Sequence, residues 1–235
     1  NIRWLLGVRL AKVNTRCQHG NMDHSLPPRG DVAHRCALIA LFGEEQACDI
    51  AARAAKLGVT PHDLAYDLLL EDDGQAMLYV AVGNYGQGTL DPIREMMLDD
   101  NTVLGLGDGG AHYGMICDAS FPTFMLSHWV RDRDHGRLPL PWVVNALTRT
   151  PAHAVGLHDR GVLAPGLKAD INVIDLARLA LHKPSVRYDL PAGGRRLTQG
   201  ADGFVATFVN GVPIQRGGQP TGQLPGQVIR QTVTA

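Results

Sequence analysis

The sequence lacks several patterns, and each absence excludes a class of structure, partner or location. Its four cysteines include no C-x-x-C pair, so we expect neither a zinc knuckle nor a disulfide scaffold in a chain of 235 residues. A formal net charge of -1 favours neither nucleic acid nor a membrane surface as partner. No apolar run is long enough to span a bilayer, and no signal-peptide pattern opens the chain. We therefore expect a cytoplasmic protein with reduced thiols.

The most informative stretch runs from residue 102 to residue 112. The apolar run Thr102–Leu106 predicts a buried strand, because it is apolar on both faces and ends at turn residues. Asp108 then follows the carboxyl end of that strand, where parallel α/β folds place their chemistry. A carboxylate there can bind a metal or move a proton. The alternative is a turn-forming aspartate that caps a nearby amide.

The chain before residue 160 alternates between helical and strand patterns. Thr60 is a typical N-cap, the residues from Asp72 to Gly74 should end that helix, and Pro151 should kink or divide a later one. Alternation of this kind implies parallel strands joined by crossover helices. We expect strands at 76–82 and 102–106, and helices at 44–57, 61–70, 91–98, 121–130 and 141–157.

The character of the sequence changes near Gly161, where strand patterns replace helical ones. A strand is expected at 170–176, and the turn Asn210–Gly211 predicts a hairpin between 204–209 and 212–215. Val228 and Ile229 could add a last short strand. Residues 1–35 show no persistent period, and they stay unassigned as a loop or a non-native leader.

Three further residues are candidates for contact with a substrate. Asn84 and Tyr85 lie in the loop after the strand 76–82, so they face the same end of the sheet as Asp108. Packing within the loop is the alternative for both. His112 could contact substrate or metal, or it could satisfy backbone groups of its own loop.

Four more side chains close to these segments have a plain structural interpretation beside a functional one. Cys117 is interpreted as a small buried side chain, with a reactive or metal-binding thiol as the alternative. Asp118 is expected to orient the Asp108 loop through backbone amides. His153 and His158, near a helix end, are expected to be structural or solvated.

Several segments together resemble one known family. GLGDGGAH at 105–112, CDASFPT at 117–123 and DRGVLAPGLKADINV at 159–173 are similar to N-acyl-D-amino-acid deacylases, the D-aminoacylase group of the amidohydrolase superfamily. The resemblance covers roughly 36–230. It implies an α/β fold: the carboxyl-terminal part of a metal-dependent TIM barrel at 36–160, followed by β-sandwich strands at 161–235.

The resemblance also implies a chemistry. Asp108 would contact a zinc ion or its bound water and act as general acid/base, and the substrate would be an N-acyl amino acid or a related small amide. The family's His-x-His is absent, and its mid-barrel metal ligands match no residue of this chain. The alternative is therefore a catalytically incomplete fragment that serves as a structural or interaction module and self-associates through unpaired barrel edges.

Overall fold

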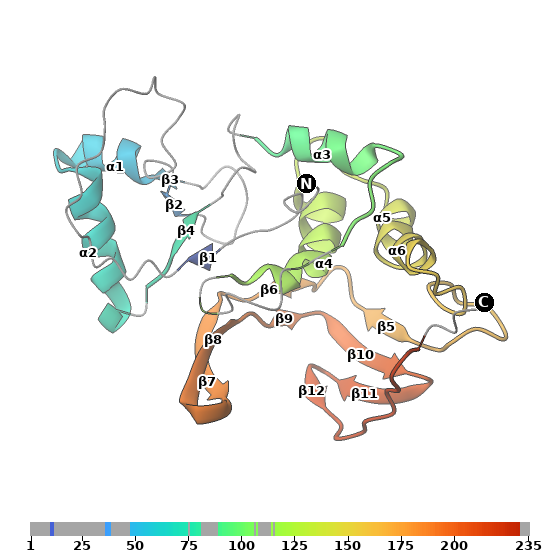
Figure 1. Cartoon of the computed structure of the whole chain (residues 1–235). Helices are drawn as coiled ribbons and strands as arrows, with labels where there is room; N and C mark the ends of the chain where they lie inside the picture. The colour runs from blue at the N-terminus through green and yellow to red at the C-terminus, as the bar shows by residue number, and fades with distance from the viewer. Residues whose placement is uncertain are drawn as a thin grey trace.

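The computed structural model describes residues 10–11, 36–38, 48–74, 76–80, 89–105, 107, 114 and 116–230. Helices α1 and α2 lie beside a small sheet, helices α3 to α6 form a second helical region, and the strands β5 to β12 lie below it (Figure 1). Mixed helix and sheet content agrees with the expected α/β class. Within the described residues, no helix is both long enough and apolar enough to cross a membrane.

The first sheet has the strand order β1-β4-β2-β3 and is antiparallel throughout. Two helices, α1 (Ile50–Leu57) and α2 (Pro61–Gly74), pack beside it through a small apolar core that includes Ala54 and Leu64. The strands are β1 (Leu10–Ala11), β2 (Cys36–Leu38), β3 (Cys48–Asp49) and β4 (Leu78–Val80).

Two expectations about strands are wrong. The expected parallel pairing does not hold, because β4 pairs antiparallel with both β1 and β2. The described residues Thr102–Gly105 form no strand. Their run is one-sided, since Leu104 is buried in the helical core while Val103 is 45% exposed. Alternation of helices and strands indicates parallel pairing only for consecutive strands of one sheet. Strand β4 and the segment Thr102–Gly105 are not two such strands.

Local signals around α2 act as expected. The Thr60 hydroxyl accepts a hydrogen bond from the Asp63 amide at 3.1 Å and donates one to the Asp63 carboxylate at 2.7 Å, so it caps the helix start. Helical geometry stops at Glu71, and Asp72 and Asp73 adopt left-handed φ values of 52° and 54°. These residues end the helix as predicted.

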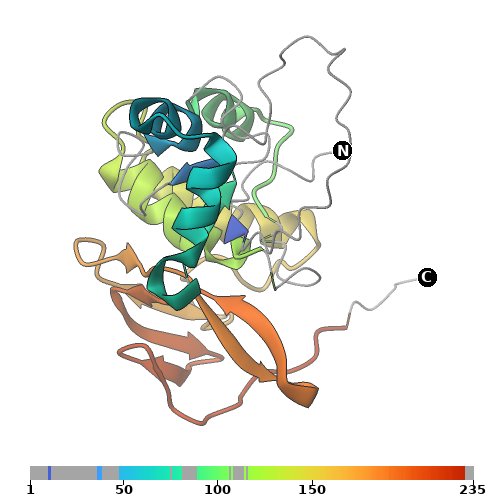
Figure 2. The same ribbon diagram turned by 90° about the vertical axis from the view of Figure 1, so that its left-hand side faces the viewer.

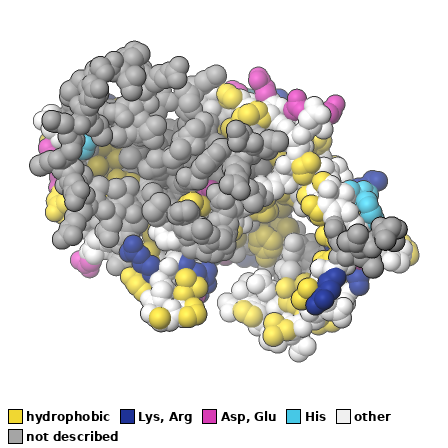
Figure 3. Space-filling view, viewed as in Figure 1, with side chains coloured by type: hydrophobic (Ala, Val, Ile, Leu, Met, Phe, Trp, Pro, Cys, Tyr) yellow, Lys and Arg dark blue, Asp and Glu magenta, His cyan; other side chains and the backbone are white. Residues whose placement is uncertain are grey.

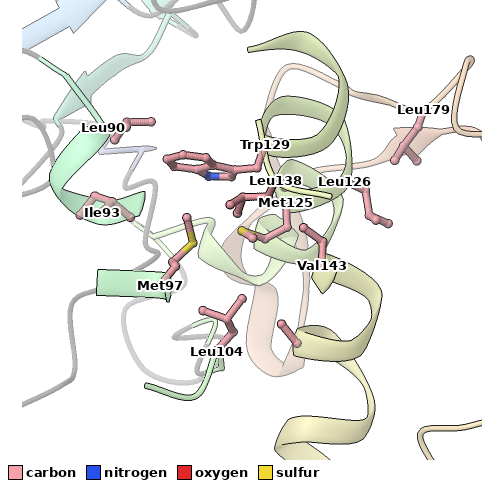
Figure 4. Packing of buried hydrophobic residues seen from close by; sticks show 11 residues of the cluster. Leu90, Ile93, Met97, Leu104, Met125, Leu126, Trp129, Leu138, Val143 and Leu179 are labelled. Atoms are coloured by element: carbon pink, nitrogen blue, oxygen red, sulfur yellow. The ribbon is translucent and has the colours of Figure 1, made fainter. Parts of the chain in front are cut away.

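The second helical region surrounds the larger core. Trp129 and Met125 lie at its centre, where side chains from α3, η4 and α5 converge (Figure 4). The expected long helix is divided into α5 and α6 at Thr148, three residues before Pro151. Proline has no amide hydrogen and cannot continue the series of helical hydrogen bonds. The elements are α3 (Asp91–Leu98), η3 (Asp118–Ser120), α4 (Phe121–Phe124), the π-helix η4 (Met125–Asp132), α5 (Leu140–Leu147) and α6 (Arg149–Ala154).

The β-rich part contains one four-stranded sheet, with the order β12-β11-β10-β5, and two separate antiparallel pairs, β6–β9 and β7–β8. The predicted Asn210–Gly211 turn is confirmed, and both residues have positive φ. Val228 and Ile229 form no strand. The strands are β5 (Ile171–Ile174), β6 (Ala180–Leu181), β7 (Ser185–Leu190), β8 (Gly194–Thr198), β9 (Ala201–Asp202), β10 (Phe204–Val209), β11 (Val212–Arg216) and β12 (Gln219–Pro220).

The β7–β8 hairpin projects away from the rest of the β-rich part (Figure 2). The short 3-10 turn η5 (Pro191–Gly193) joins its strands. Arg196 and Asp189 pair across it through two hydrogen bonds of 2.7 Å, and this pairing lowers the pKa of Asp189. Basic and hydrophobic side chains lie side by side over the hairpin (Figure 3).

The helical and β-rich parts share one core. Leu179, between β5 and β6, is fully buried in the cluster that contains Trp129, and Ile174 and Phe204 pack against the same cluster. Arg131 adds a polar link, because its guanidinium donates to the carbonyl of Leu176. The β-rich part therefore helps to bury the helical core.

Candidate active site

The four site residues that the sequence predicts, Asp108, His112, Asn84 and Tyr85, all lie outside the described residues. Their roles stay predictions. The structure does describe residues on both sides of this loop, Gly107 before it and the residues from Ile116 after it.

Gly107, the residue directly before Asp108, makes a close approach to the backbone of η3. A Cβ atom at this position would lie 3.0 Å from the Cα of Ala119 and 3.2 Å from the carbonyl oxygen of Asp118. These are backbone atoms, which cannot swing aside as a long side chain can. The absence of a side chain at Gly107 thus lets the backbone of this residue lie directly against η3.

Side chains that follow the loop are buried. Cys117 is a free, buried thiol, and its pKa is raised to about 11, first by burial and then by the charge of Asp118. Its interpretation as a small buried side chain is confirmed. Asp118 is also buried, at 4% exposure. Its expected role in orienting the Asp108 loop stays a prediction.

A polar link that the sequence did not predict joins η3 to the β-rich part. The Ser120 hydroxyl lies 2.6 Å from Oε1 of Gln199, and Nε2 of Gln199 donates to the His182 carbonyl at 2.9 Å. Ser120 and Gln199 are 79 positions apart in the sequence. No local pattern could have indicated this pair.

A second unpredicted feature is the buried arginine Arg133, at 2% exposure. Its Nη2 lies 2.6 Å from Oδ1 of Asp91 on α3, and its guanidinium stands 4.5 Å from the ring centre of Trp129. The hydrogen bond from Arg133 is the main cause of the lowered pKa of Asp91. This pair fixes α3 to the loop after η4.

The described residues do not supply a metal site. Among them, no three side chains of His, Cys, Asp or Glu gather closely enough to hold an ion. His153 and His158 pack edge to face with ring centres 4.9 Å apart, which fits their expected structural role. The donor set that zinc requires is therefore not met within the described ranges.

The sequence matches the model of the Amidohydrolase family over residues 10–215. The match covers most of the chain, and the chain therefore belongs to the amidohydrolase family. This confirms the resemblance that the segments 105–112, 117–123 and 159–173 indicated. The match begins inside the stretch 1–35 that the sequence left unassigned.

Two curated relatives come from different activity classes. Adenine deaminase 1 of Rhizobium johnstonii is 28% identical over 91% of this chain and 37% of its own length. D-aminoacylase of Alcaligenes xylosoxydans xylosoxydans is 34% identical over 48% of this chain and 21% of its own length. The chain thus spans little more than a third of the length of adenine deaminase 1 and about a fifth of the length of D-aminoacylase.

Solved structures of D-aminoacylase are also similar to the chain. A D-aminoacylase mutant in complex with CuCl2 has a TM-score of 0.47 and 24% identity, and the match covers 81% of this chain and 36% of that one. A structure described as defining a novel subset of amidohydrolases has a TM-score of 0.45 and 25% identity, over 76% of this chain and 33% of that one.

Proposed function

We propose that this chain is the carboxyl-terminal part of a metal-dependent hydrolase that cleaves non-peptide amide carbon–nitrogen bonds, with N-acyl-D-amino acids as the substrate class. The observation that carries the proposal is the family match over 10–215, which includes the segment GLGDGGAH at 105–112. The proposed domains are barrel elements at 36–160 and sandwich strands at 161–235. Zinc is the cofactor that the family resemblance implies, with Asp108 as one ligand.

Asp108 has the role of general acid/base in this proposal. It takes a proton from the attacking water as the new carbon–oxygen bond forms, and it passes that proton to the amine as the carbon–nitrogen bond breaks. A carboxylate with a glycine on each side in the sequence suits this task, because glycine carries no side chain that would crowd a substrate carbonyl. Asn84, Tyr85 and His112 are proposed to contact the substrate.

A second candidate reaction is hydrolytic deamination of an aminopurine. It is favoured by the match to adenine deaminase 1, which spans 91% of this chain, against 48% for D-aminoacylase. Both reactions add water at an sp² carbon and expel nitrogen, so the same acid/base residue serves either. They differ in the product, since deacylation releases an amino acid and deamination releases ammonia.

The decisive experiment compares Asp108→Asn with the unchanged protein on both substrate types. Asn keeps the size of the side chain but cannot take a proton, so kcat should fall by about 10²–10⁴-fold while KM changes little. His112→Asn is the control, and it should reduce kcat less. Near-normal turnover by Asp108→Asn would refute the assigned role.

Metal analysis separates the enzyme from the alternative of a non-catalytic module. Bound zinc together with release of an amino acid or ammonia supports the hydrolase. A chain that binds no zinc, turns over neither substrate and self-associates supports a module with unpaired sheet edges.

A further inference from the structure

We propose that Gln199, in the β-rich part, is a positioning residue for the catalytic segment: through Ser120 it holds η3 against Gly107, the residue that precedes Asp108. This inference rests on the proposed function of Asp108. It starts from a contact between segments that are distant in sequence, and each of its links is a described contact.

The orientation of the Gln199 amide follows from its two neighbours. The His182 carbonyl can only accept a hydrogen bond, so the Nε2 atom of Gln199, 2.9 Å away, must face it. Oε1 therefore faces Ser120, and at 2.6 Å the Ser120 hydroxyl must donate to it. The Ser120 hydroxyl therefore binds an oxygen atom whose position is fixed, because the Gln199 amide cannot flip without losing its bond to His182.

His182 is itself held in the β-rich part. Its amide donates to the Gly200 carbonyl at 2.9 Å, and its Nε2 lies 3.0 Å from Oδ1 of Asp202. It directly follows β6, which pairs with β9 and contacts α4. Gln199 thus connects η3 to an anchored strand end and not to a free loop.

The last link runs from η3 to Gly107. Ser120 belongs to η3, whose backbone at Asp118 and Ala119 leaves little space for a side chain at Gly107. A shift of η3 by a few tenths of an ångström therefore changes the space available to Gly107, the residue that precedes Asp108 in the sequence. Small displacements of this size matter for a group that transfers a proton, because the transfer depends on short distances.

Amide hydrogen exchange of the whole chain tests the proposal without any need for turnover. The Phe121 amide, which donates to the Asp118 carbonyl, reports on opening of η3, and the Gly107 amide reports on the last link. Gln199→Met has a similar shape but neither polar atom, so it loses the bonds to Ser120 and to the His182 carbonyl. Both amides should then exchange at least about fivefold faster, which is the effect of one net hydrogen bond. Gln215→Met, on the exposed face of β11, is the matched control and should leave both rates unchanged.

Ser120→Ala removes the bond to Gln199 and the 3.1 Å contact of the same hydroxyl with the Cys117 carbonyl, so it should also accelerate exchange. The double variant Ser120→Ala/Gln199→Met should show less than the sum of the two single effects, because the Ser120–Gln199 bond is lost in both. In an active protein, Gln199→Met should lower kcat with little change in KM, which loss of stability alone would not produce. Unchanged exchange at Gly107, or faster exchange with an unchanged kcat, would overturn the proposal. If the unchanged protein has no turnover, the proposed function fails, and exchange at Gly107 alone then decides whether Gln199 holds this segment.

Discussion

A pair of glycines with the same positive φ offers a sharp test of the junction between the helical and β-rich parts. Gly161 and Gly166 both have φ of +87°. A Cβ atom at Gly161 would lie 2.8 Å from the Cα and 2.9 Å from the amide nitrogen of Arg149, at the start of α6. A Cβ atom at Gly166 would meet nothing within 4 Å. The two positions therefore share a positive φ, and Gly161 adds the close approach.

The magnitudes follow from separate contributions. Placing alanine in the left-handed region costs about 1–2 kcal/mol, and the reduced entropy of the unfolded chain returns about 0.4–1 kcal/mol. These contributions apply equally to both variants and cancel in the comparison. Gly161→Ala additionally forces backbone atoms apart, for which overpacking costs of about 1–3 kcal/mol are typical. We expect Gly161→Ala to be less stable than Gly166→Ala by that amount.

Urea unfolding followed by far-UV circular dichroism measures this difference. Both variants should keep the slope of the unfolding transition, so that the shift in midpoint reports the free energy of unfolding. A difference below about 0.5 kcal/mol would mean that the backbone at Gly161 does not meet Arg149, and the described junction would be wrong.

Two further predictions concern ionisable groups. Because the pKa of Cys117 is raised from 9.0 to about 11, its thiolate fraction at pH 8 should be roughly a hundredfold smaller than in the unfolded chain. Iodoacetamide should therefore react with Cys117 correspondingly slowly in the folded protein. Equal reaction rates with and without urea would contradict the burial of this thiol. The pKa of Asp91 is lowered, chiefly by the hydrogen bond from Arg133, so its contribution to stability is present above its ordinary pKa of 3.8 and is lost as the pH falls through the lower folded value. The stability of Asp91→Asn should therefore depend less on pH in this acid range, and identical pH profiles from urea unfolding would count against the pair.

Features governed by neighbouring residues could be predicted from the sequence. The Thr60 cap, the Asn210–Gly211 turn and the helix division near Pro151 each depend on the chemistry of a few adjacent residues. Their outcome does not depend on where the rest of the chain lies. The structure confirms all three for this reason.

Strand pairing could not be predicted in the same way. The apolar run at Thr102–Gly105 has the composition of a strand, but Leu104 packs into the core of α3 and η4, and the segment forms no ladder. Similarly, β4 finds antiparallel partners that lie far from it in the sequence. Hydrophobic pattern shows that a segment is buried, but the direction and identity of its partners are set by contacts across the whole fold.

The candidate site includes features of both kinds, those set by neighbouring residues and those set by distant contacts. A local motif points to Asp108, yet the residue that we propose to hold its flank, Gln199, has no local signature. Its partner Ser120 directly precedes Phe121, which packs against the core that the helical part shares with Leu179 of the β-rich part. The boundary expected at residue 161 stays a prediction. Even if it separates two domains by sequence, the shared core means that loosening the β-rich strands should disturb η3 and the segment that leads to Asp108.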